Sequence, residues 1–455
     1  MPIESINPYD GSLIETYSPA TDDQVESVLE RAAATFDTWR DTPIADRAER
    51  MRAAAAILCE RAEPYATLMA REMGKPLAQG RAEITKCAWA AEYYADHAAR
   101  FLAPEPVDAG TVSSHVAFAP LGVVLAVMPW NFPFWQVFRF AAPALMAGNT
   151  AILKHASNVS GCALEIESVF VDAGFPAGAF STLLISSGRV AGLVADRRVR
   201  AVTLTGSTPA GRAVASVAGQ HLKKTVLELG GSDPYLILDE AELERTAQDC
   251  AAARLVNGGQ SCVAAKRFIV LEAFRPRFEA LLVEAIGRRR TGDPLAADTD
   301  VGPQARRDLR DELHAQVEAS IAAGARLLLG GQVPEGPGAM YPPTVLTGVT
   351  PGMPAYDQEL FGPVAAIIAA RDEDDAIRIA NDSDFGLGAA VYTTDRTQAQ
   401  RVVDRLDAGN CFINGFVRSD PRLPFGGVKD SGYGRELAAF GIREFVNIKT
   451  VCRII

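Results

Sequence analysis

Short apolar runs bounded by glycine or proline dominate the chain from residue 112 onward, and stretches with helical periodicity separate them. The runs before Gly231 are HVAFAPLGVVLAVM, NTAILKH, FSTLLI, AVTLT and TVLEL. Apolar runs of this length are typical of buried β-strands, and strands that alternate with helices predict a parallel sheet with crossovers. The alternation restarts after Gly231 in PYLIL, RFIVL, ARLLLGG, PVAAIIAA, GAAVYT and CFING, which predicts a second α/β domain. Between Thr21 and His97, apolar residues recur at spacings of three and four, as in helices.

The composition is that of a globular protein that contacts neither nucleic acid nor a membrane. Hydrophobic residues make up 48% and charged residues 22% of the 455 residues. The formal net charge of -11, without a basic run to override it, repels nucleic acid and anionic membrane surfaces. The N-terminus lacks the basic and apolar regions of a signal peptide, and no uncharged apolar stretch of about 18 residues follows. We therefore expect a cytoplasmic location.

The cysteines argue against both a disulfide framework and a metal site. They are odd in number, form no CxxC pair and have no histidine cluster nearby. In a reducing compartment every thiol is available for chemistry. The positions are Cys59, Cys87, Cys162, Cys250, Cys262, Cys411 and Cys452.

The C-terminal segment GIREFVNIKTVCRII alternates apolar and polar residues near its end. An apolar strand at a terminus usually pairs with a sheet edge. That edge could belong to another subunit or to the segment's own domain, and the sequence leaves both pairings open.

The segment PWNFPFWQVFRF places polar groups at a predicted strand-to-helix turn. The helix can start at Pro133, where a missing N–H costs nothing. Asn131 can then donate a hydrogen bond to a developing oxyanion, or it can simply be a turn or cap residue. Trp135 and Arg139 are four apart and share a helix face. Arg139 could bind a substrate carboxylate through its planar fork, or it could form a structural ion pair.

Three later segments carry further candidates. Lys154 follows an apolar strand, at the edge where parallel α/β sheets bind ligands. Gly206 and Gly211 flank a turn whose backbone could approach a pyrophosphate, although a glycine-bounded loop that binds no ligand is the simpler explanation of this motif alone. Cys262 follows a glycine-rich turn and is a candidate nucleophile, while Glu228 in ELGG is a candidate general base for water. Taken alone, each could instead be a packing or solvated residue.

The order and type of these motifs resemble the aldehyde dehydrogenase superfamily over essentially the whole chain. The motifs are PWNFP, the lysine of LKHAS, LTGS with Gly211, ELGG, GQSC, ELFGPV and PFGGVKDSGYGRE. Within the family, WQVFR and RSDPRLPFGG look like the succinate-semialdehyde dehydrogenase branch. The resemblance implies an α/β fold with a Rossmann-like cofactor-binding domain (1–109 and 122–230) and an α/β catalytic domain (231–420). It also implies a small β extension for oligomerisation (110–121 and 436–455) in a homodimer or homotetramer.

The resemblance also implies a role for each site residue. Cys262 matches the nucleophile, Glu228 the base, and Asn131 the side-chain donor of the oxyanion hole. Lys154 matches the residue at the adenosine ribose, and the remaining cofactor residues are Trp130, Ser157, Gly206, Ser207, Gly211, Leu229, Glu359 and Phe361. The substrate residues are Trp135, Arg139, Ser261 and Ser419, of which Arg139 and Ser419 match positions that hold a carboxylate.

The implied reaction is oxidation of a short aldehyde such as succinate semialdehyde through a Cys262 thioester, without a metal. Many NAD-preferring members carry Glu where this chain has Ser157, and a hydroxyl beside Lys154 accommodates a 2′-phosphate without charge repulsion. We therefore expect NADP to be preferred and NAD to be accepted. An enzyme that passes the acyl group to coenzyme A would not need Glu228. A structural cofactor-binding protein would not need Cys262, Asn131 and Glu228 together.

Overall fold

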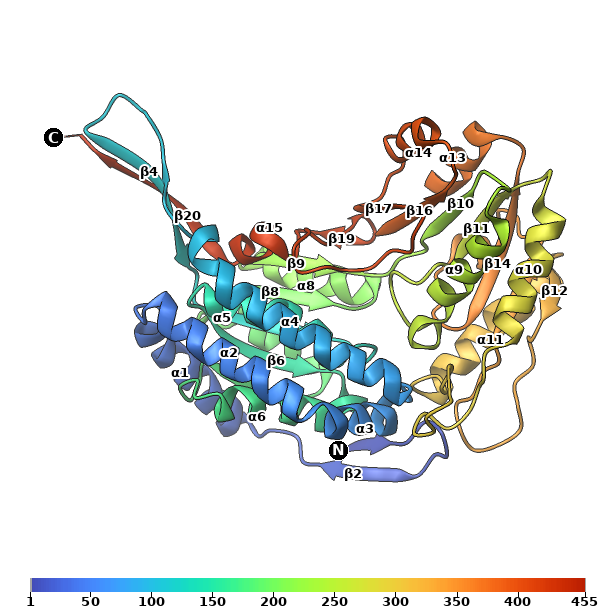
Figure 1. The fold of residues 1–455 in the computed structure, drawn as a ribbon. Helices are drawn as coiled ribbons and strands as arrows, with labels where there is room; N and C mark the ends of the chain where they lie inside the picture. The colour runs from blue at the N-terminus through green and yellow to red at the C-terminus, as the bar shows by residue number, and fades with distance from the viewer. Residues whose placement is uncertain (1, 455) are drawn as a thin grey trace.

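The computed structural model describes residues 2–454 and contains two large sheets, each flanked by helices, with a small third sheet projecting from one side (Figure 1). The N-terminal region is helical, as its periodicity predicts. Thr21 and Gln24 form a capping box at the start of the first helix, which satisfies backbone N–H groups that have no partner inside the helix. The helices are α1 (Asp22–Trp39), α2 (Ile44–Glu60), α3 (Ala62–Met73) and α4 (Leu77–Phe101).

The first large sheet has the strand order β19-β9-β8-β5-β6-β7 and is parallel except for β19. Its strands are β5 (Val123–Met128), β6 (Thr150–His155), β7 (Phe180–Thr182), β8 (Val199–Thr205), β9 (Lys224–Glu228) and β19 (Gly432–Tyr433). The connecting helices are α5 (Trp135–Met146), α6 (Ser160–Asp172), α7 (Val190–Ala195) and α8 (Thr208–Gln220). Alternate residues of β5 enter two different cores, Val124 on one face and Leu125 on the other. Both faces of the sheet are therefore covered, which is why its strands are continuous apolar runs.

The second large sheet has the order β12-β13-β14-β11-β10-β16-β17 and is parallel except for the edge strand β12. Its strands are β10 (Pro234–Ile237), β11 (Arg267–Leu271), β12 (Arg326–Leu329), β13 (Thr344–Thr347), β14 (Val364–Ala370), β16 (Gly388–Tyr392) and β17 (Asn410–Ile413). Its helices are α9 (Leu243–Leu255), α10 (Arg275–Gly287), α11 (Arg307–Ala322), α13 (Glu373–Asn381) and α14 (Arg396–Val403). The sequence analysis missed β13, a short strand whose residues are all buried.

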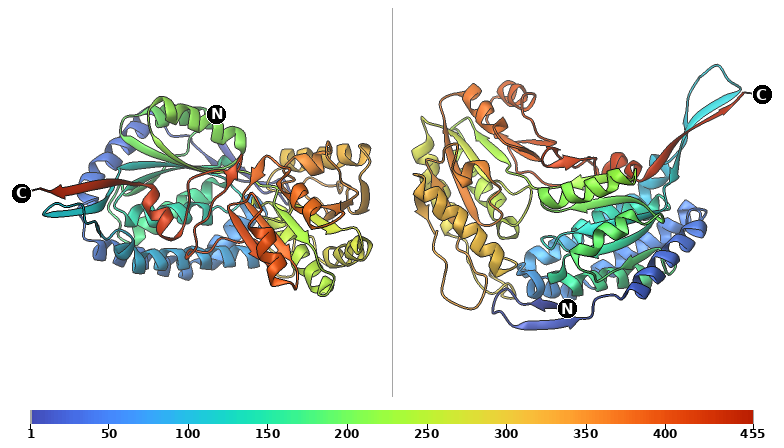
Figure 2. Two further views of the ribbon diagram at one scale, coloured as in Figure 1. Left: turned by 90° about the horizontal axis from the view of Figure 1, so that it is seen from above. Right: turned by 180° about the vertical axis from the view of Figure 1, so that it is seen from behind.

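The projecting sheet joins β3 (Glu105–Pro106), β4 (Ser113–Pro120) and the C-terminal strand β20 (Val446–Arg453). The register of β20 on β4 runs from Val446 opposite Pro120 to Arg453 opposite Ser113. The C-terminal strand thus pairs with β4 of its own chain and forms one edge of this sheet. In Figures 1 and 2 the sheet extends well away from both helical layers. Its role in oligomerisation, like the residue boundaries of the domains, stays a prediction.

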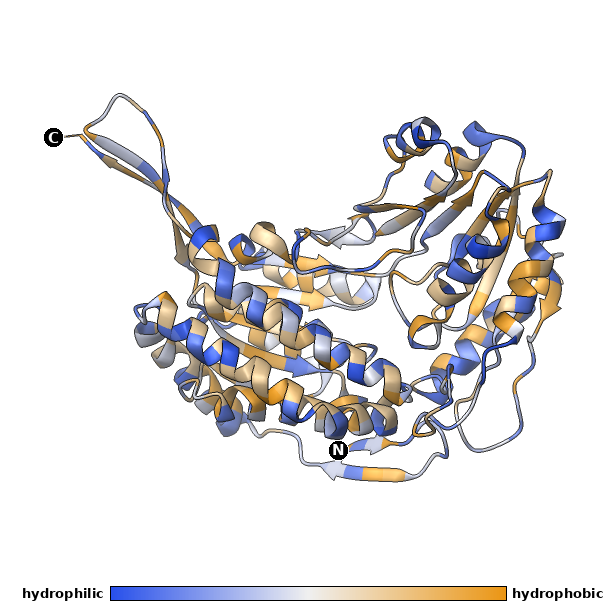
Figure 3. Cartoon of the chain, in the orientation of Figure 1, coloured by the Kyte–Doolittle hydropathy of each residue, from blue (hydrophilic) through white to orange (hydrophobic). Residues whose placement is uncertain are grey.

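Smaller elements complete the fold: β1 (Ile3–Ile6) with β2 (Leu13–Tyr17), β15 (Phe385–Gly386) with β18 (Val428–Lys429), α12 (Pro354–Asp357) and α15 (Ala438–Glu444). In Figure 3 the hydrophobic colours gather on the strands and on the helix faces that cover them. Within residues 2–454, no helix is both long enough and apolar enough to cross a membrane.

Candidate active site

The candidate site lies where the strand order of the first sheet reverses. The chain runs from β5 outward through β6 and β7, then returns to the other side of β5 as β8 and β9. Open parallel sheets bind ligands at such a switch point, beyond the carboxyl ends of the strands. A cavity of about 240 Å³ opens there. It is lined by Pro129, Trp130, Asn131, Thr205, Gly206, Ser207, Leu229, Gly230, Cys262, Leu309, Glu359 and Phe361.

A tight turn of unusual backbone conformation presents Cys262 to this cavity. Asn257 and Gly258 have φ of 54° and 62°, and Gly259 has 76°. A side chain at Gly259 would place its Cβ 2.2 Å from the Gly362 carbonyl oxygen, so only glycine fits there. The glycine pair in the sequence is thus explained by the shape of the nucleophile turn.

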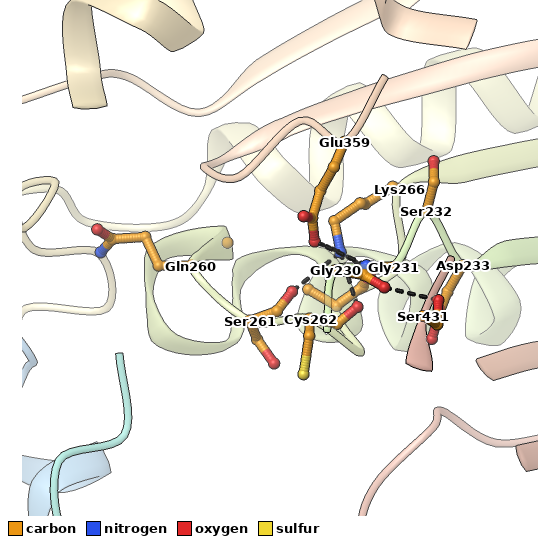
Figure 4. Close-up of polar contacts among 12 residues, drawn as sticks. Gly230, Gly231, Ser232, Asp233, Gln260, Ser261, Cys262, Lys266, Glu359 and Ser431 are labelled. Atoms are coloured by element: carbon orange, nitrogen blue, oxygen red, sulfur yellow. Dashed lines mark hydrogen bonds and ion pairs between the residues drawn. The ribbon is translucent and has the colours of Figure 1, made fainter. Parts of the chain in front are cut away.

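Lys266 holds the nucleophile turn from behind. Its Nζ donates to the carbonyl oxygens of Ser261 and Cys262, at 3.0 and 2.9 Å, and lies 3.4 Å from Glu359 Oε1. Figure 4 shows the Ser261 and Cys262 side chains pointing away from Lys266. The sequence analysis missed Lys266, whose signal is a lysine directly before the buried strand β11.

The Cys262 thiol opens onto the cavity and is otherwise enclosed by protein. Burial raises the pKa of this thiol to about 12, although the nearby cations Arg139 and Lys266 oppose the shift. The sulfur is therefore a protonated thiol in the resting protein near neutral pH, and it must lose its proton before it can act as a nucleophile.

Asn131 is buried beside the nucleophile turn. Its Nδ2 donates to the Gln260 backbone carbonyl oxygen at 3.1 Å, and the backbone carbonyl oxygen of Asn131 accepts from Asn257 Nδ2 at 2.6 Å. An amide nitrogen carries two N–H groups, so one donor remains for a substrate oxygen. The structure thus brings Asn131 and Cys262 to one cavity, as an oxyanion hole requires.

Glu83 of α4 fixes the start of the helix that follows Asn131. Its Oε1 accepts from the N–H groups of Phe134 and Trp135, both at 2.9 Å, and its other oxygen contacts Lys75. A carboxylate at a helix N-terminus satisfies free N–H groups and interacts favourably with the helix dipole. Helix α5 accordingly begins at Trp135, two residues after the Pro133 start that the sequence allowed.

Glu228 is the last residue of β9 and is 2% exposed. Within residues 2–454, neither of its carboxyl oxygens has a hydrogen-bond partner. Burial raises the pKa of Glu228 well above its usual value, and the neighbouring Glu436 raises it further. When ionised, a carboxylate with a raised pKa is a stronger base than an ordinary carboxylate, which suits a general base.

Lys154 is the penultimate residue of β6, and Ser157 follows the end of that strand. Lys154 is 9% exposed, has no polar partner within residues 2–454, and burial lowers the pKa of its ammonium group. Ser157, at the start of a short 3-10 helix (Ser157–Val159), is exposed. A partly buried cation without a counterion beside an exposed hydroxyl is suited to a phosphorylated ribose.

The turn after β8 has room for a phosphate. A Cβ at Gly206 would meet nothing closer than 3.6 Å, and the side chain of Ser207, at the N-cap of α8, makes no cap hydrogen bond. The N–H groups at the start of α8 are therefore available to an anion. Gly211 has a different function: its absent Cβ would lie 2.5 Å from Leu229 Cδ2, so it allows α8 to pack on Leu229.

Glu359 and Phe361 close the opposite wall of the cavity. Glu359 Oε1 accepts from the Gly231 N–H at 3.0 Å, and the Phe361 ring packs edge-on against Trp130 with centroids 5.7 Å apart. Glu359, Phe361 and the turn after β8 line one largely apolar cavity. This arrangement fits a nicotinamide dinucleotide, which would be held by side chains that the resemblance implies.

Arg139 forms an ion pair with Glu436 of the same chain. Arg139 is 2% exposed, contacts the Glu436 carboxylate and donates to Thr205 Oγ1 at 3.3 Å, and its guanidinium lies over the Phe425 ring. The ion-pair alternative therefore describes Arg139, and a direct contact with a substrate carboxylate is not supported. Sequence could not show this, because Glu436 comes from a distant segment.

Trp135 and Ser419 both contact a cation other than Arg139, namely Lys86. Lys86 of α4 donates from Nζ to Ser419 Oγ at 2.7 Å and lies 4.3 Å from the centroid of the Trp135 ring. The structure thus joins two of the predicted substrate residues through a residue that the sequence analysis missed. Its signal is weak: one lysine on the otherwise buried face of a helix.

The part of the chain that the structure describes holds no group of three or more His, Cys, Asp or Glu side chains placed to bind a metal ion. Cys262 and Asn131 line one cavity, and the buried Glu228 carboxyl lies near enough to influence the pKa of the Cys262 thiol. The chain matches the aldehyde dehydrogenase family over residues 1–451 and belongs to that family.

Individual relatives show which members of the family this chain resembles. The chain is 51% identical over 451 residues to a probable succinate-semialdehyde dehydrogenase (NADP+) of Synechocystis, with 99% of each chain covered. It is 50% identical over 454 residues to succinate-semialdehyde dehydrogenase (NADP+) 1 of Mycobacterium tuberculosis, again with 99% of each covered. The solved succinic semialdehyde dehydrogenase of Streptococcus pyogenes in complex with NADP+ is 37% identical, has a TM-score of 0.97 and is covered completely in both directions. The expected family and α/β fold class are therefore confirmed.

Proposed function

We propose that this protein oxidises succinate semialdehyde to succinate and that NADP+ accepts the hydride. The observation that carries the proposal is the single cavity that contains Cys262, Asn131 and most of the predicted cofactor residues. The names of relatives at 50 and 51% identity support the substrate and the cofactor.

Each chain residue has a defined task in the proposed reaction. Cys262 releases its proton to solvent and its sulfur forms a bond to the aldehyde carbon. Asn131 Nδ2 and the Cys262 backbone N–H stabilise the oxyanion, and one such donor contributes roughly 2.7–4 kcal/mol. The bound cofactor supplies a ring that accepts hydride.

Glu228 completes the turnover. After loss of the hydride, the acyl group remains on Cys262 as a thioester. Glu228 takes a proton from water, the resulting hydroxide attacks the acyl carbon, and the C–S bond breaks to return the Cys262 thiolate. Retention of Glu228 supports hydrolysis rather than transfer to coenzyme A.

The NADP preference follows from Lys154 and Ser157. The ammonium group attracts a 2′-phosphate, and the Ser157 hydroxyl can hydrogen-bond to it without charge repulsion. We also propose that the projecting sheet supports a homodimer or homotetramer. A reducing cytoplasm would keep the Cys262 thiol available.

The test is an assay of NADPH formation with succinate semialdehyde and no coenzyme A, with Cys262→Ala as the control. We expect succinate as the product, no turnover by the control, and a kcat/KM for NADP+ at least ten times that for NAD+. A requirement for coenzyme A, or equal turnover by Cys262→Ala, would contradict the proposed reaction. A tenfold preference for NAD+ would contradict the cofactor assignment alone.

A further inference from the structure

The first turns of helix α4 connect the two halves of the candidate active site. The helix packs in the same hydrophobic core as α5 and the first large sheet. Its beginning, however, is hydrogen-bonded to the part of the chain that carries the second large sheet (Figure 1). Gln79 Nε2 donates to the Asp300 carbonyl oxygen there, at 3.0 Å. One helix therefore contacts both the part that supplies the oxyanion donor and the part that supplies the nucleophile.

Gln79 also holds the beginning of the nucleophile turn (257–262). Its Oε1 accepts from the Asn257 N–H at 2.7 Å. Asn257 is buried and has a φ of 54°, a left-handed conformation that persists only where surrounding contacts maintain it. Lys266 holds the other end of this turn through the Cys262 carbonyl oxygen, at 2.9 Å. The turn is thus held at its end by a residue of its own sheet and at its beginning by a residue of α4.

The same face of α4 holds the oxyanion donor one helical turn further on. Glu83 follows Gln79 by four residues, so the two side chains lie on one face of the helix. Glu83 accepts from N–H groups at the start of α5. Lys75 contacts Glu83, and its Nζ lies 3.9 Å from the centroid of the Phe132 ring. The residue directly after Asn131 and the helix that follows it are therefore both fixed to this part of the chain.

Asn257 links the nucleophile turn to the oxyanion donor. Its Nδ2 donates to the backbone carbonyl oxygens of Asn131 and Gln260, at 2.6 and 3.0 Å. Because Gln79 holds the backbone of Asn257, a shift of that backbone would change how the two turns face each other. We propose that Gln79 is a positioning residue that fixes the distance between the Cys262 sulfur and the Asn131 amide. This inference rests on the proposed function and adds to it a residue outside the reacting groups.

The amide of Gln79 suits this task because it carries an acceptor and a donor. The acceptor satisfies the Asn257 N–H, and the donor satisfies the Asp300 carbonyl oxygen. A methionine of similar length can do neither, whereas a glutamate can still accept from the Asn257 N–H. Gln79 is not among the residues that line the cavity, so its replacement leaves the lining unchanged. A misplacement of about 1 Å at a reacting centre can cost about 10²-fold in rate.

The experiment measures the single-turnover rate constant of NADPH formation at saturating succinate semialdehyde and NADP+. Gln79→Met should lower this rate constant about tenfold or more, whereas Gln79→Glu should stay within about fivefold of the wild type. Gln400→Met removes an exposed glutamine of α14 that donates to Asp404, and it should leave the rate constant unchanged. Gln79→Asn keeps the amide on a side chain one methylene shorter, and it should lower the rate constant about threefold or more. The Asn variant takes the place of the Met variant if the latter does not fold.

A double-mutant cycle with Asn131→Ala separates positioning from a general structural defect. If Gln79 acts by aligning the sulfur with the Asn131 amide, its replacement has no further effect once that amide is absent. The double variant should therefore stay within about twofold of Asn131→Ala alone, whereas a general defect would multiply the two losses.

Multiplied losses, a Gln79→Glu variant as slow as Gln79→Met, or a wild-type rate in both Gln79→Met and Gln79→Asn would overturn the role of Gln79 and leave the proposed function standing. If the wild type forms no NADPH from succinate semialdehyde, the proposed function and the role of Gln79 are both overturned.

Discussion

Replacement of Asn131 separates a catalytic role from a structural one. The side chain donates to the Gln260 carbonyl oxygen at 3.1 Å, but Asn257 Nδ2 donates to the same oxygen at 3.0 Å. Asn131→Ala therefore leaves that acceptor satisfied, and the loss of one hydrogen bond should cost about 0.5–1.5 kcal/mol of folding stability. If Asn131 also donates to the oxyanion, kcat should fall by about 10²–10³, which corresponds to roughly 2.7–4 kcal/mol.

Asn131→Asp sharpens the test because its side chain has the same shape. It removes the donor and places a negative charge beside the developing oxyanion, where like charges about 4 Å apart repel by about 4 kcal/mol at an effective dielectric constant of about 20. The Asp variant should be slower than the Ala variant at pH values where the carboxyl is ionised.

The assay is single-turnover NADPH formation by rapid mixing, with thermal unfolding of each variant as the stability control. Single turnover isolates the steps before the thioester is hydrolysed. A loss smaller than tenfold in Asn131→Ala, or an Asp variant as fast as the Ala variant, would refute the oxyanion assignment.

Three further predictions follow from the site. Glu228→Gln should retain the first turnover of NADPH but slow the steady-state rate by about 10²–10⁴. Because the base form of Glu228 is lost as pH falls through its raised pKa, the wild-type rate of hydrolysis should decline with acid well above pH 4.5. A steady-state pH profile in which the Gln variant shows the same decline would contradict this. Ser157→Glu should reverse the cofactor preference by repelling the 2′-phosphate, which the ratio of kcat/KM for NADP+ and NAD+ measures; an unchanged ratio would mean that Ser157 does not face the ribose. Glu83→Gln should destabilise the protein by about 3–5 kcal/mol because it leaves Lys75 buried without a counterion, as denaturant unfolding would report, whereas the neutral pair Lys75→Met with Glu83→Gln should recover part of the loss.

The sequence predicted the large sheets and the nucleophile for local reasons. Buried parallel strands need continuous apolar runs, and a turn with positive φ needs glycine, so both features are written in neighbouring residues. The same local logic failed for β13, which is too short to differ from any other brief apolar run. It also misplaced the start of α5 by two residues, because the carboxylate that caps this helix comes from α4.

The residues proposed for the chemistry, Cys262, Asn131 and Glu228, could thus be predicted from residue type and motif order. The environment of these residues in the folded chain could not be predicted in this way. That Arg139 is neutralised by Glu436, and that Lys86 reaches Ser419 across 333 residues of sequence, depends on how distant segments pack. Counterions and burial are long-range properties of the folded chain, so no local run of residues encodes them.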